Sequence, residues 1–150
     1  MTHTFNTPIG AVRLVEEDGS IIRIGLTDIT DTSSAPTPLL REAEHQITAF
    51  LRGERRQLDF PIRMVGTAFQ QRVWQALLQI PYGATRTYGA IATAICNPRA
   101  SRAVGMACNK HPLLLIVPCH RLVGANGKLV GFAYGTEAKR WLLELEKSIL

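Results

Sequence analysis

Long apolar runs and paired cysteines are both missing from this chain of 150 residues. No apolar stretch reaches the roughly 20 residues that a membrane-spanning helix needs, and the opening MTHTFNTPIG lacks the basic start and apolar run of a signal peptide. The three cysteines, Cys96, Cys108 and Cys119, form no CxxC pair, so neither a disulfide framework nor a zinc site is indicated. We therefore expect a cytoplasmic protein with reduced thiols, no bound metal, and no membrane partner.

Acidic residues are scarce in the second half of the chain. Residues 1–66 carry 7 Lys and Arg against 9 Asp and Glu, a net charge of −2, whereas residues 67–150 carry 10 against 3, a net charge of +7. Clustered cations gain affinity for a polyanion by releasing its condensed counterions. The second half therefore suits nucleic acid, and the alternative is an ordinary basic surface.

The first half, residues 1–63, is predicted to be a small mixed domain. Residues 8–26 partly alternate apolar and polar side chains around an Asp-Gly turn, which predicts a β-hairpin. Residues 27–38 are rich in Thr, Ser and Pro and predict a surface loop. Apolar residues then recur at helical spacing over 38–52, with Gly53 placed to end that helix.

The second half, residues 67–150, is predicted to be mostly helical. Its best-specified helix opens with capping-box spacing between Thr67 and Gln70. Two short helices follow, the first capped by Thr87 and the second over residues 101–110. Joined by a tight turn, they have the outline of a helix-turn-helix.

Small residues on the second of these helices favour close contact with another surface. Ser101, Ala103 and Gly105 flank Arg102, whereas helices that read the major groove usually bear long Asn, Gln and Arg side chains. One interpretation is a helix laid in the DNA minor groove, with Arg102 reaching into the base stack. The other is close packing of two helices.

A buried strand or extended segment is predicted for the apolar run 113–118, and a final helix for 136–150. On that helix Glu144 lies on the solvent side and Glu146 on the apolar side. An unpaired buried carboxylate is too unfavourable to keep, so Glu146 needs a partner. His120 is a candidate.

The segment IVPCHRLVG, residues 116–124, places Cys119 directly before His120. A free cysteine is only a few per cent thiolate at neutral pH, and a neighbouring histidine raises that fraction. In a straight strand the two side chains would point to opposite faces, so they cooperate only if the chain turns at Pro118 or a water bridges them. The alternative is a structural cysteine beside an unrelated histidine. Cys96 and Cys108 lack such a neighbour and are predicted to be packing residues.

The segments PYGATRTYGAIA, SRAVGMA, IVPCHRLVGANGKLVGF and KRWLLELE, in this order and spacing, resemble the O6-alkylguanine-DNA alkyltransferase family, also called methylated-DNA-protein-cysteine methyltransferases. The resemblance runs over about residues 67–146 and is loose over 1–63. It implies an α+β chain with a small ribonuclease H-like α/β domain at 1–63 (a β-hairpin plus a helix), followed by a mostly helical DNA-binding domain with a helix-turn-helix at 67–150. It also implies a monomer that binds double-stranded DNA through the minor groove, without a cofactor.

The resemblance further implies single-turnover DNA repair. In such a protein Cys119 takes the alkyl group from O6-alkylguanine, and also from O4-alkylthymine, as a stable thioether. The His120 position activates the cysteine through a water, and the Glu146 position orients the histidine. The Tyr88 position contacts the guanine and helps to protonate it as it leaves, and the Lys139 position favours the thiolate.

Family positions also imply the contacts with DNA. Arg102 would fill the gap left by a nucleotide that rotates out of the duplex, and the carbonyl of Leu122 would accept a hydrogen bond from the guanine amino group. The other implied DNA contacts are Thr87, Tyr88, Ser101, Ala103 and Gly105.

Several positions depart from the family pattern. His111 replaces the usual asparagine hinge, and an imidazole can donate one hydrogen bond but cannot reproduce the donor and acceptor pair of an amide in the same plane. In the pocket loop Phe132 replaces a tyrosine, and Ala133 replaces the serine of some members, leaving only a backbone N–H as donor. Tyr134 stands where members range from glycine to bulky residues, and we expect it to narrow the pocket.

Three other functions compete with this interpretation. An alkyltransferase-like protein would bind the lesion without chemistry, but such proteins lack the cysteine that this chain has at Cys119. A helix-turn-helix regulator would not need Glu146 or the segment Pro-Cys-His-Arg at residues 118–121, the PCHR segment. A cysteine hydrolase would need an oxyanion site and a separate Cys, His and Asn spacing, which the sequence does not suggest.

Overall fold

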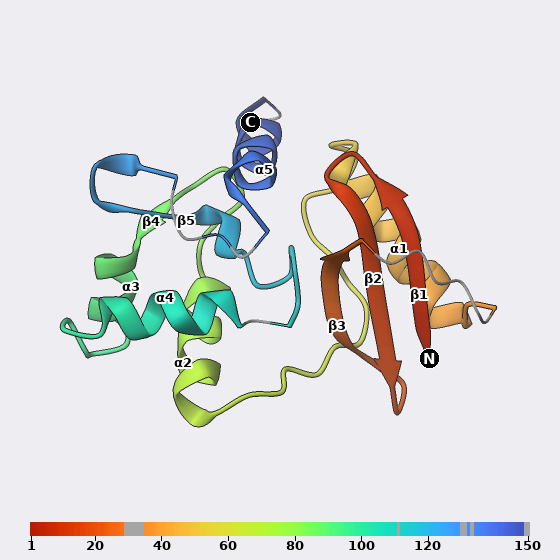
Figure 1. Cartoon of the computed structure of the whole chain (residues 1–150), viewed down its shortest axis with the longest axis horizontal. Coiled ribbons are helices and arrows are strands. Elements are labelled where there is room, and N and C mark those ends of the chain that lie inside the picture. Colours follow the sequence, from red (N-terminus) through yellow and green to blue (C-terminus); the bar gives the residue numbers. More distant parts are fainter. Residues whose placement is uncertain (29–34, 111, 130–131, 133, 149–150) are drawn as a thin grey trace. The chain divides into compact units, whose positions relative to one another are not determined.

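The computed structural model describes residues 1–28, 35–110, 112–129, 132 and 134–148, and it mixes helices with strands (Figure 1). The chain forms two compact units, one of Met1–Val65 with Pro112–Leu114 and the other of Gly66–His111 with Leu115–Leu150. Within the described residues, none of the helices has the length and apolar character required to cross a bilayer.

The first unit holds a three-stranded antiparallel sheet with α1 packed against it (Figure 1). Its elements are β1 (Thr2–Thr7), β2 (Gly10–Glu17), β3 (Ser20–Thr27) and α1 (Pro38–Leu51). Strands β2 and β3 are the predicted hairpin, and its turn residues Asp18 and Gly19 both have positive φ, 53° and 79°, as a two-residue hairpin turn requires. The expectation of a hairpin alone is corrected, because β1 adds a third strand along β2.

Helix α1 begins and ends close to its predicted bounds. The hydroxyl oxygen of Thr37 accepts from the backbone N–H of Leu40 at the N-terminus, and Gly53 follows the last turn with a φ of 76°, which a glycine adopts without strain. The predicted loop at 27–38 lies partly outside the described residues, which omit 29–34. Buried core side chains of this unit include Val12, Leu14, Ile21, Ile24, Leu40, Ile47 and Phe50.

The second unit is built mainly of helices that pack on one another (Figure 1). Its elements are α2 (Ala68–Leu77), β4 (Arg86–Thr87), α3 (Tyr88–Ala94), α4 (Ser101–Asn109), η1 (Cys119–Arg121), β5 (Leu122–Val123), η2 (Ala125–Gly127) and α5 (Thr136–Ser148). Helices α2, α3 and α4 contact one another in pairs, and α5 packs on η1. The buried side chains Val73, Trp74, Leu77, Ile91, Val104, Leu142 and Leu143 form much of its core.

The start of α2 confirms the predicted capping box. The hydroxyl oxygen of Thr67 accepts from the N–H of Gln70 at 3.1 Å, and the side chain of Gln70 accepts from the N–H of Thr67 at 2.9 Å. One turn later the indole N–H of Trp74 donates to the carbonyl of Ala107 at 3.0 Å, which joins α2 to α4. Thr87 caps α3 as predicted, with its hydroxyl oxygen 3.0 Å from the N–H of Ala90.

The apolar run before Cys119 is buried, but it does not form a continuous strand. Leu113 makes an isolated bridge with Ile24 of the first unit's sheet, and the chain turns at Leu115, whose φ is 74°. After the PCHR segment, β5 pairs in parallel with β4 through the partners Arg86 with Leu122 and Thr87 with Val123. This pairing places the residue before Tyr88 beside the segment that follows Arg121.

Candidate active site

The chain turns directly after Pro118, which was one of the two conditions under which Cys119 and His120 could cooperate. Residues Cys119–Arg121 form a single turn of 3₁₀ helix. Cys119 is 3% exposed and His120 is fully buried, so both side chains lie inside the second unit. The adjacent pair therefore shares one interior environment.

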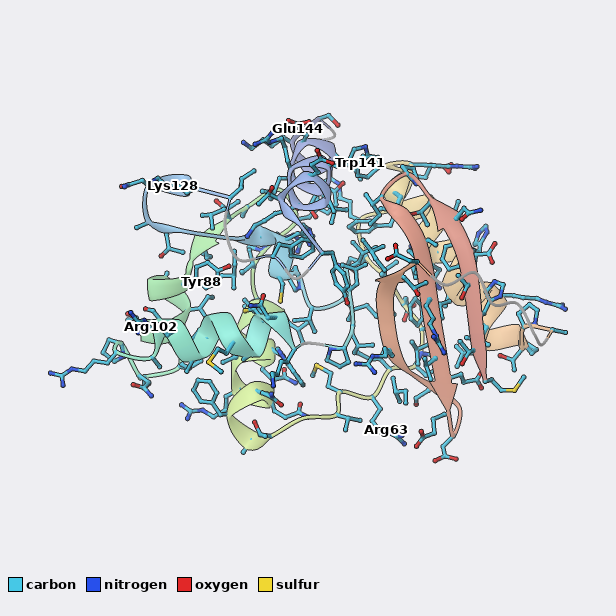
Figure 2. The ribbon with its side chains drawn as sticks, viewed as in Figure 1. Arg63, Tyr88, Arg102, Lys128, Trp141 and Glu144 are labelled. Atoms are coloured by element: carbon cyan, nitrogen blue, oxygen red, sulfur yellow. The ribbon has the colours of Figure 1, made fainter. Side chains whose placement is uncertain are left out.

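Glu146 of α5 faces the interior, as predicted, and binds His120. Nε2 of His120 lies 2.7 Å from Oε2 of Glu146, and both side chains are fully buried. The backbone N–H of Gly83 donates to Oε1 of the same carboxylate at 3.0 Å. Glu144, two residues earlier, is exposed on the outer side of α5, as the helical spacing predicts (Figure 2).

Arg121 is a third partner of this carboxylate, and the sequence did not suggest it. Its Nε donates to Oε1 of Glu146 and its Nη2 to Oε2, each at 2.9 Å. Its Nη1 donates to the carbonyl of Ile80 at 2.9 Å, and its guanidinium lies 5.5 Å from the ring centroid of Tyr82. The argument that a buried Glu146 needs a partner applies equally to an arginine next to the histidine, and this was the missed signal.

These contacts set the charge states of the pair. Hydrogen bonds from His120 and Arg121 outweigh the effect of burial and hold the pKa of Glu146 down, at about 2. Burial lowers the pKa of His120, and although Glu146 opposes this effect, the pKa of the imidazole stays below its ordinary value of 6.5. At neutral pH the site therefore holds a carboxylate, a guanidinium and a neutral imidazole.

A neutral His120 has one N–H and one proton acceptor. Because Glu146 is ionised and accepts only, the hydrogen bond at 2.7 Å requires the proton on Nε2. The remaining nitrogen, Nδ1, is buried and has no hydrogen-bond partner among the described residues. The carboxylate thus leaves His120 with Nδ1 as its proton acceptor.

The Cys119 thiol is protonated at neutral pH. Its Sγ donates to the carbonyl of Cys108 at 3.6 Å, and burial, reinforced by Cys108, raises the pKa of the thiol well above its ordinary value. Lys139 lowers this pKa, in the predicted direction, but burial is the larger effect. Among the other cysteines, Cys108 is buried as predicted, whereas the packing role predicted for Cys96 is wrong because that residue is exposed.

Tyr88 and Lys139 lie close together in the same unit. Burial is the largest of the effects that raise the pKa of the Tyr88 phenol to about 12, so the phenol keeps its proton at neutral pH. Nζ of the buried Lys139 lies 5.9 Å from the ring centroids of both Tyr88 and Phe132. A methyl group added at Gly105 of α4 would lie 3.8 Å from the Tyr88 ring, so α4 passes along one side of this tyrosine.

Helix α4 turns one face to the surface. Arg102 and Met106 are exposed one turn apart on this helix, and Met106 is 63% exposed. Ser101, Ala103 and Gly105 are half-buried at the edges of that face. Figure 2 shows Arg102 at the start of α4, near Tyr88 at the start of α3.

The predicted pocket residues are described only in part. Leu122 is buried in β5, and Phe132 and Tyr134 pack edge to face with ring centroids 5.6 Å apart. The predictions for His111 and Ala133 fall on residues outside those that the structure describes. In the described ranges, no cluster of three His, Cys, Asp or Glu side chains is arranged to hold a metal ion.

The amino-acid sequence is similar to a known family model and to named proteins. Residues 68–148 match the family model described as the 6-O-methylguanine DNA methyltransferase, DNA binding domain. A methylated-DNA--protein-cysteine methyltransferase of Methanosarcina acetivorans is 44% identical over 96% of this chain and 96% of its own length. One of Mycobacterium bovis is 45% identical over 97% of this chain and 91% of its own.

Solved structures give the same result over both units. The chain superposes on a Mycobacterium tuberculosis O6-methylguanine methyltransferase with a TM-score of 0.87 and 44% identity, covering all of this chain and 95% of that one. The structure of the M. tuberculosis OGT in complex with DNA gives a TM-score of 0.89 and 45% identity, with coverages of 99% and 93%. The chain therefore belongs to the O6-methylguanine-DNA methyltransferase family, and DNA is its partner.

Proposed function

We propose that this protein repairs DNA by transferring an alkyl group, typically methyl, from O6-alkylguanine irreversibly to Sγ of Cys119, with O4-alkylthymine as a second substrate. The observation that carries the proposal is the hydrogen bond of 2.7 Å between Glu146 and His120, directly beside a buried thiol. The sulfur–carbon bond forms as the carbon–O6 bond breaks. Because a thioether does not release its alkyl group, each molecule acts once.

His120 acts as the general base. The thiol is protonated at rest, so it must lose its proton as the sulfur attacks. Nδ1 of His120 is the proton acceptor that the carboxylate of Glu146 leaves available, and it takes the proton from Cys119 through a bridging water. Lys139, whose charge favours the thiolate, helps to stabilise the developing negative sulfur.

Tyr88 acts as the proton donor to the departing base. A guanine that loses its O6-methyl group carries negative charge unless it gains a proton. The raised pKa of Tyr88 keeps the phenol protonated and able to donate. One proton leaves Cys119 and one reaches the guanine, so the reaction is neutral overall.

Helices α3 and α4 act as a helix-turn-helix that docks in the minor groove. The small residues Ser101, Ala103 and Gly105 let α4 approach the groove closely. Thr87 and Tyr88 contact the adjacent DNA backbone. Arg102 inserts where the damaged nucleotide has rotated out, which offsets part of the few kcal/mol that extrusion costs. The exposure of Arg102 supports this role.

The flipped base is held by the segment after the PCHR turn. The carbonyl of Leu122 accepts from the guanine amino group, and Phe132, Ala133 and Tyr134 form the wall of the pocket. His111 takes the hinge position between α4 and the strand-like run that leads to Cys119.

The remaining features of the proposal concern the whole chain. The first unit acts as a ribonuclease H-like N-terminal domain, an assignment that its three-stranded sheet and helix α1 support. The protein acts as a monomer without a cofactor, in the cytoplasm, where a reducing environment keeps an acceptor thiol free.

The test is intact mass and peptide mapping after mixing the purified protein with excess duplex DNA that contains one O6-methylguanine. We expect one added methylene per molecule, located on the peptide that bears Cys119. The Cys119→Ala variant should gain no mass, and Cys96→Ala is the matched control that should react fully. Tight binding of the lesion without any gain in mass would overturn the proposal and leave a lesion sensor.

A further inference from the structure

Arg121 makes more contacts around the catalytic pair than its position in the sequence suggests. Its guanidinium binds both oxygens of the Glu146 carboxylate at 2.9 Å, and a third nitrogen reaches the carbonyl of Ile80. The side chain is 9% exposed, so these bonds are largely shielded from water. A two-pronged bond of this kind fixes both the position and the rotation of a carboxylate.

Arg121 also joins three segments that are distant in sequence. Ile80 follows α2, Tyr82 lies in the turn after it, and Glu146 lies on α5. The segment after Arg121, β5, pairs with β4, which directly precedes Tyr88. The arginine thus lies in η1 with the proposed base, His120, and next to β5, whose pairing with β4 connects this turn to the proposed proton donor, Tyr88.

We infer that Arg121 is a positioning residue for the alkyl transfer, which acts through Glu146 to hold His120 neutral and with Nδ1 as its proton acceptor. This inference rests on the proposed function of Cys119 and His120. The two-pronged bond aims one carboxylate oxygen at Nε2 of His120, and the guanidinium charge offsets the carboxylate charge that would otherwise draw a second proton onto the imidazole.

The charges that face His120 come from its own turn and from α5. Glu146 raises the pKa of the imidazole, while Arg121 and Lys139 lower it, and burial is the largest effect in the lowering direction. Removing the Arg121 charge alone therefore moves the pKa of His120 upward. The imidazole would then take up a proton at a higher pH than in wild type, and a protonated imidazole cannot accept the proton of Cys119.

The experiment measures the single-turnover rate of methyl transfer from duplex O6-methylguanine between about pH 5.5 and about pH 9. We expect Arg121→Gln to be at least ~10-fold slower than wild type near pH 7. The acid limb of its pH–rate profile, where the rate falls as His120 is protonated, should lie at higher pH than in wild type, and the rate should recover in alkali. Arg121→Lys keeps the positive charge but loses the bidentate hydrogen bond to Glu146. Its acid limb should therefore stay in place, while its rate falls several-fold at every pH. Arg140→Gln, which removes an exposed arginine of α5, should match wild type.

A double-mutant cycle separates positioning from general damage to the fold. Because Arg121 acts through Glu146, the pair Arg121→Gln with Glu146→Gln should react no more slowly than Glu146→Gln alone. If Arg121→Gln does not fold, the same cycle is run with Arg121→Lys. The inference would be overturned if the factors by which the two single substitutions slow the reaction multiplied in the double variant. It would also be overturned if the acid limb of Arg121→Gln coincided with that of wild type. Failure of wild type itself to transfer the methyl group would instead overturn the proposed function.

Discussion

The backbone N–H of Gly83 donates to Oε1 of Glu146 at 3.0 Å, across 63 positions of sequence. His120 and Arg121 bind the same carboxylate, which therefore has partners from the turn after α2 and from both residues that follow Cys119. One side chain of α5 thus orients the proposed base and also anchors the turn that leads toward Tyr88. Changes at Glu146 should affect catalysis and stability together.

Glu146→Gln should slow the alkylation of Cys119 by ~10-fold or more. A neutral amide cannot stabilise the imidazolium that forms when His120 accepts the thiol proton, and the amide can donate as well as accept, so it no longer fixes the tautomer. The protein is mixed with duplex DNA that contains O6-methylguanine, and the reaction is quenched at a series of times. Mapping the Cys119 peptide at each time gives the rate. Glu144→Gln is the control on the exposed side of the same helix and should react like wild type. Equal slowing by both variants would contradict the assignment of the two faces.

The stability of the protein should fall as the pH is lowered through two windows. The pKa of His120 is lowered in the folded state, so the unfolded chain binds more protons below about pH 6.5. The pKa of Glu146 is held at about 2 against an ordinary value of 4.5, so its contribution is present above pH 4.5 and is lost between these values. Denaturant midpoints measured across this range should decrease steadily toward acid.

Glu146→Gln is the informative variant for this pH dependence. It should be less stable than wild type at neutral pH, because Arg121 loses its counter-charge, but its midpoint should change less below pH 4.5. Glu144→Gln should keep the wild-type dependence. A Glu146→Gln variant with the same acid slope as wild type would show that other carboxylates control the transition.

Cysteine reactivity should follow exposure in the free protein. Cys96 is exposed, whereas Cys119 is 3% exposed and burial raises the pKa of its thiol. A thiolate reagent such as iodoacetamide, applied briefly near neutral pH, should therefore modify Cys96 before Cys119. Peptide mapping at early times gives the order, and the same measurement in denaturant should remove the difference. Faster native modification of Cys119 would mean that the thiol is ionised despite its burial.

Much of this site could be predicted from sequence because short-range patterns determine it. The 3.6-residue period of α5 places Glu146 inward and Glu144 outward, and proline before Cys119 provides the turn that brings the thiol and imidazole into one interior. Arg121 was missed because neighbouring residues point in different directions along an extended chain, and only the 3₁₀ turn lets it share a carboxylate with His120.

The elements that the sequence failed to predict depend on long-range pairing. Strand β1 has only one position, Thr4, that is buried, so no apolar alternation marks it, and its pairing with β2 defines it. The apolar run that includes Leu113 and Leu115 has the composition of a strand, but its pairing with Ile24 is confined to one bridge, and the positive φ of Leu115 interrupts it. Composition alone could not show where that pairing stops.

Arg102→Ala should impair repair of duplex DNA much more than reaction with a free base. The side chain is exposed and is proposed to fill the gap left by the flipped nucleotide, a role that has no counterpart when O6-benzylguanine is the substrate. We expect a loss of at least ~10-fold on the duplex, since about 1.4 kcal/mol of lost stabilisation has that effect. Arg41→Ala, an exposed arginine of α1, is the control. Equal losses on both substrates would place Arg102 in the chemistry instead of in base extrusion.

Tyr134 should restrict which alkyl groups the pocket accepts. Its ring packs edge to face on Phe132, at a centroid distance of 5.6 Å, and so adds bulk to the proposed pocket wall. Removing the ring in Tyr134→Gly should raise the rate with O6-benzylguanine relative to O6-methylguanine by about 10-fold, the usual scale for a steric change in an apolar pocket. Both rates are measured on the same preparation, with Phe5→Leu, which removes a ring of β1 in the first unit, as the control. An unchanged ratio would mean that the benzyl group does not reach Tyr134 and that another part of the pocket loop sets the size limit.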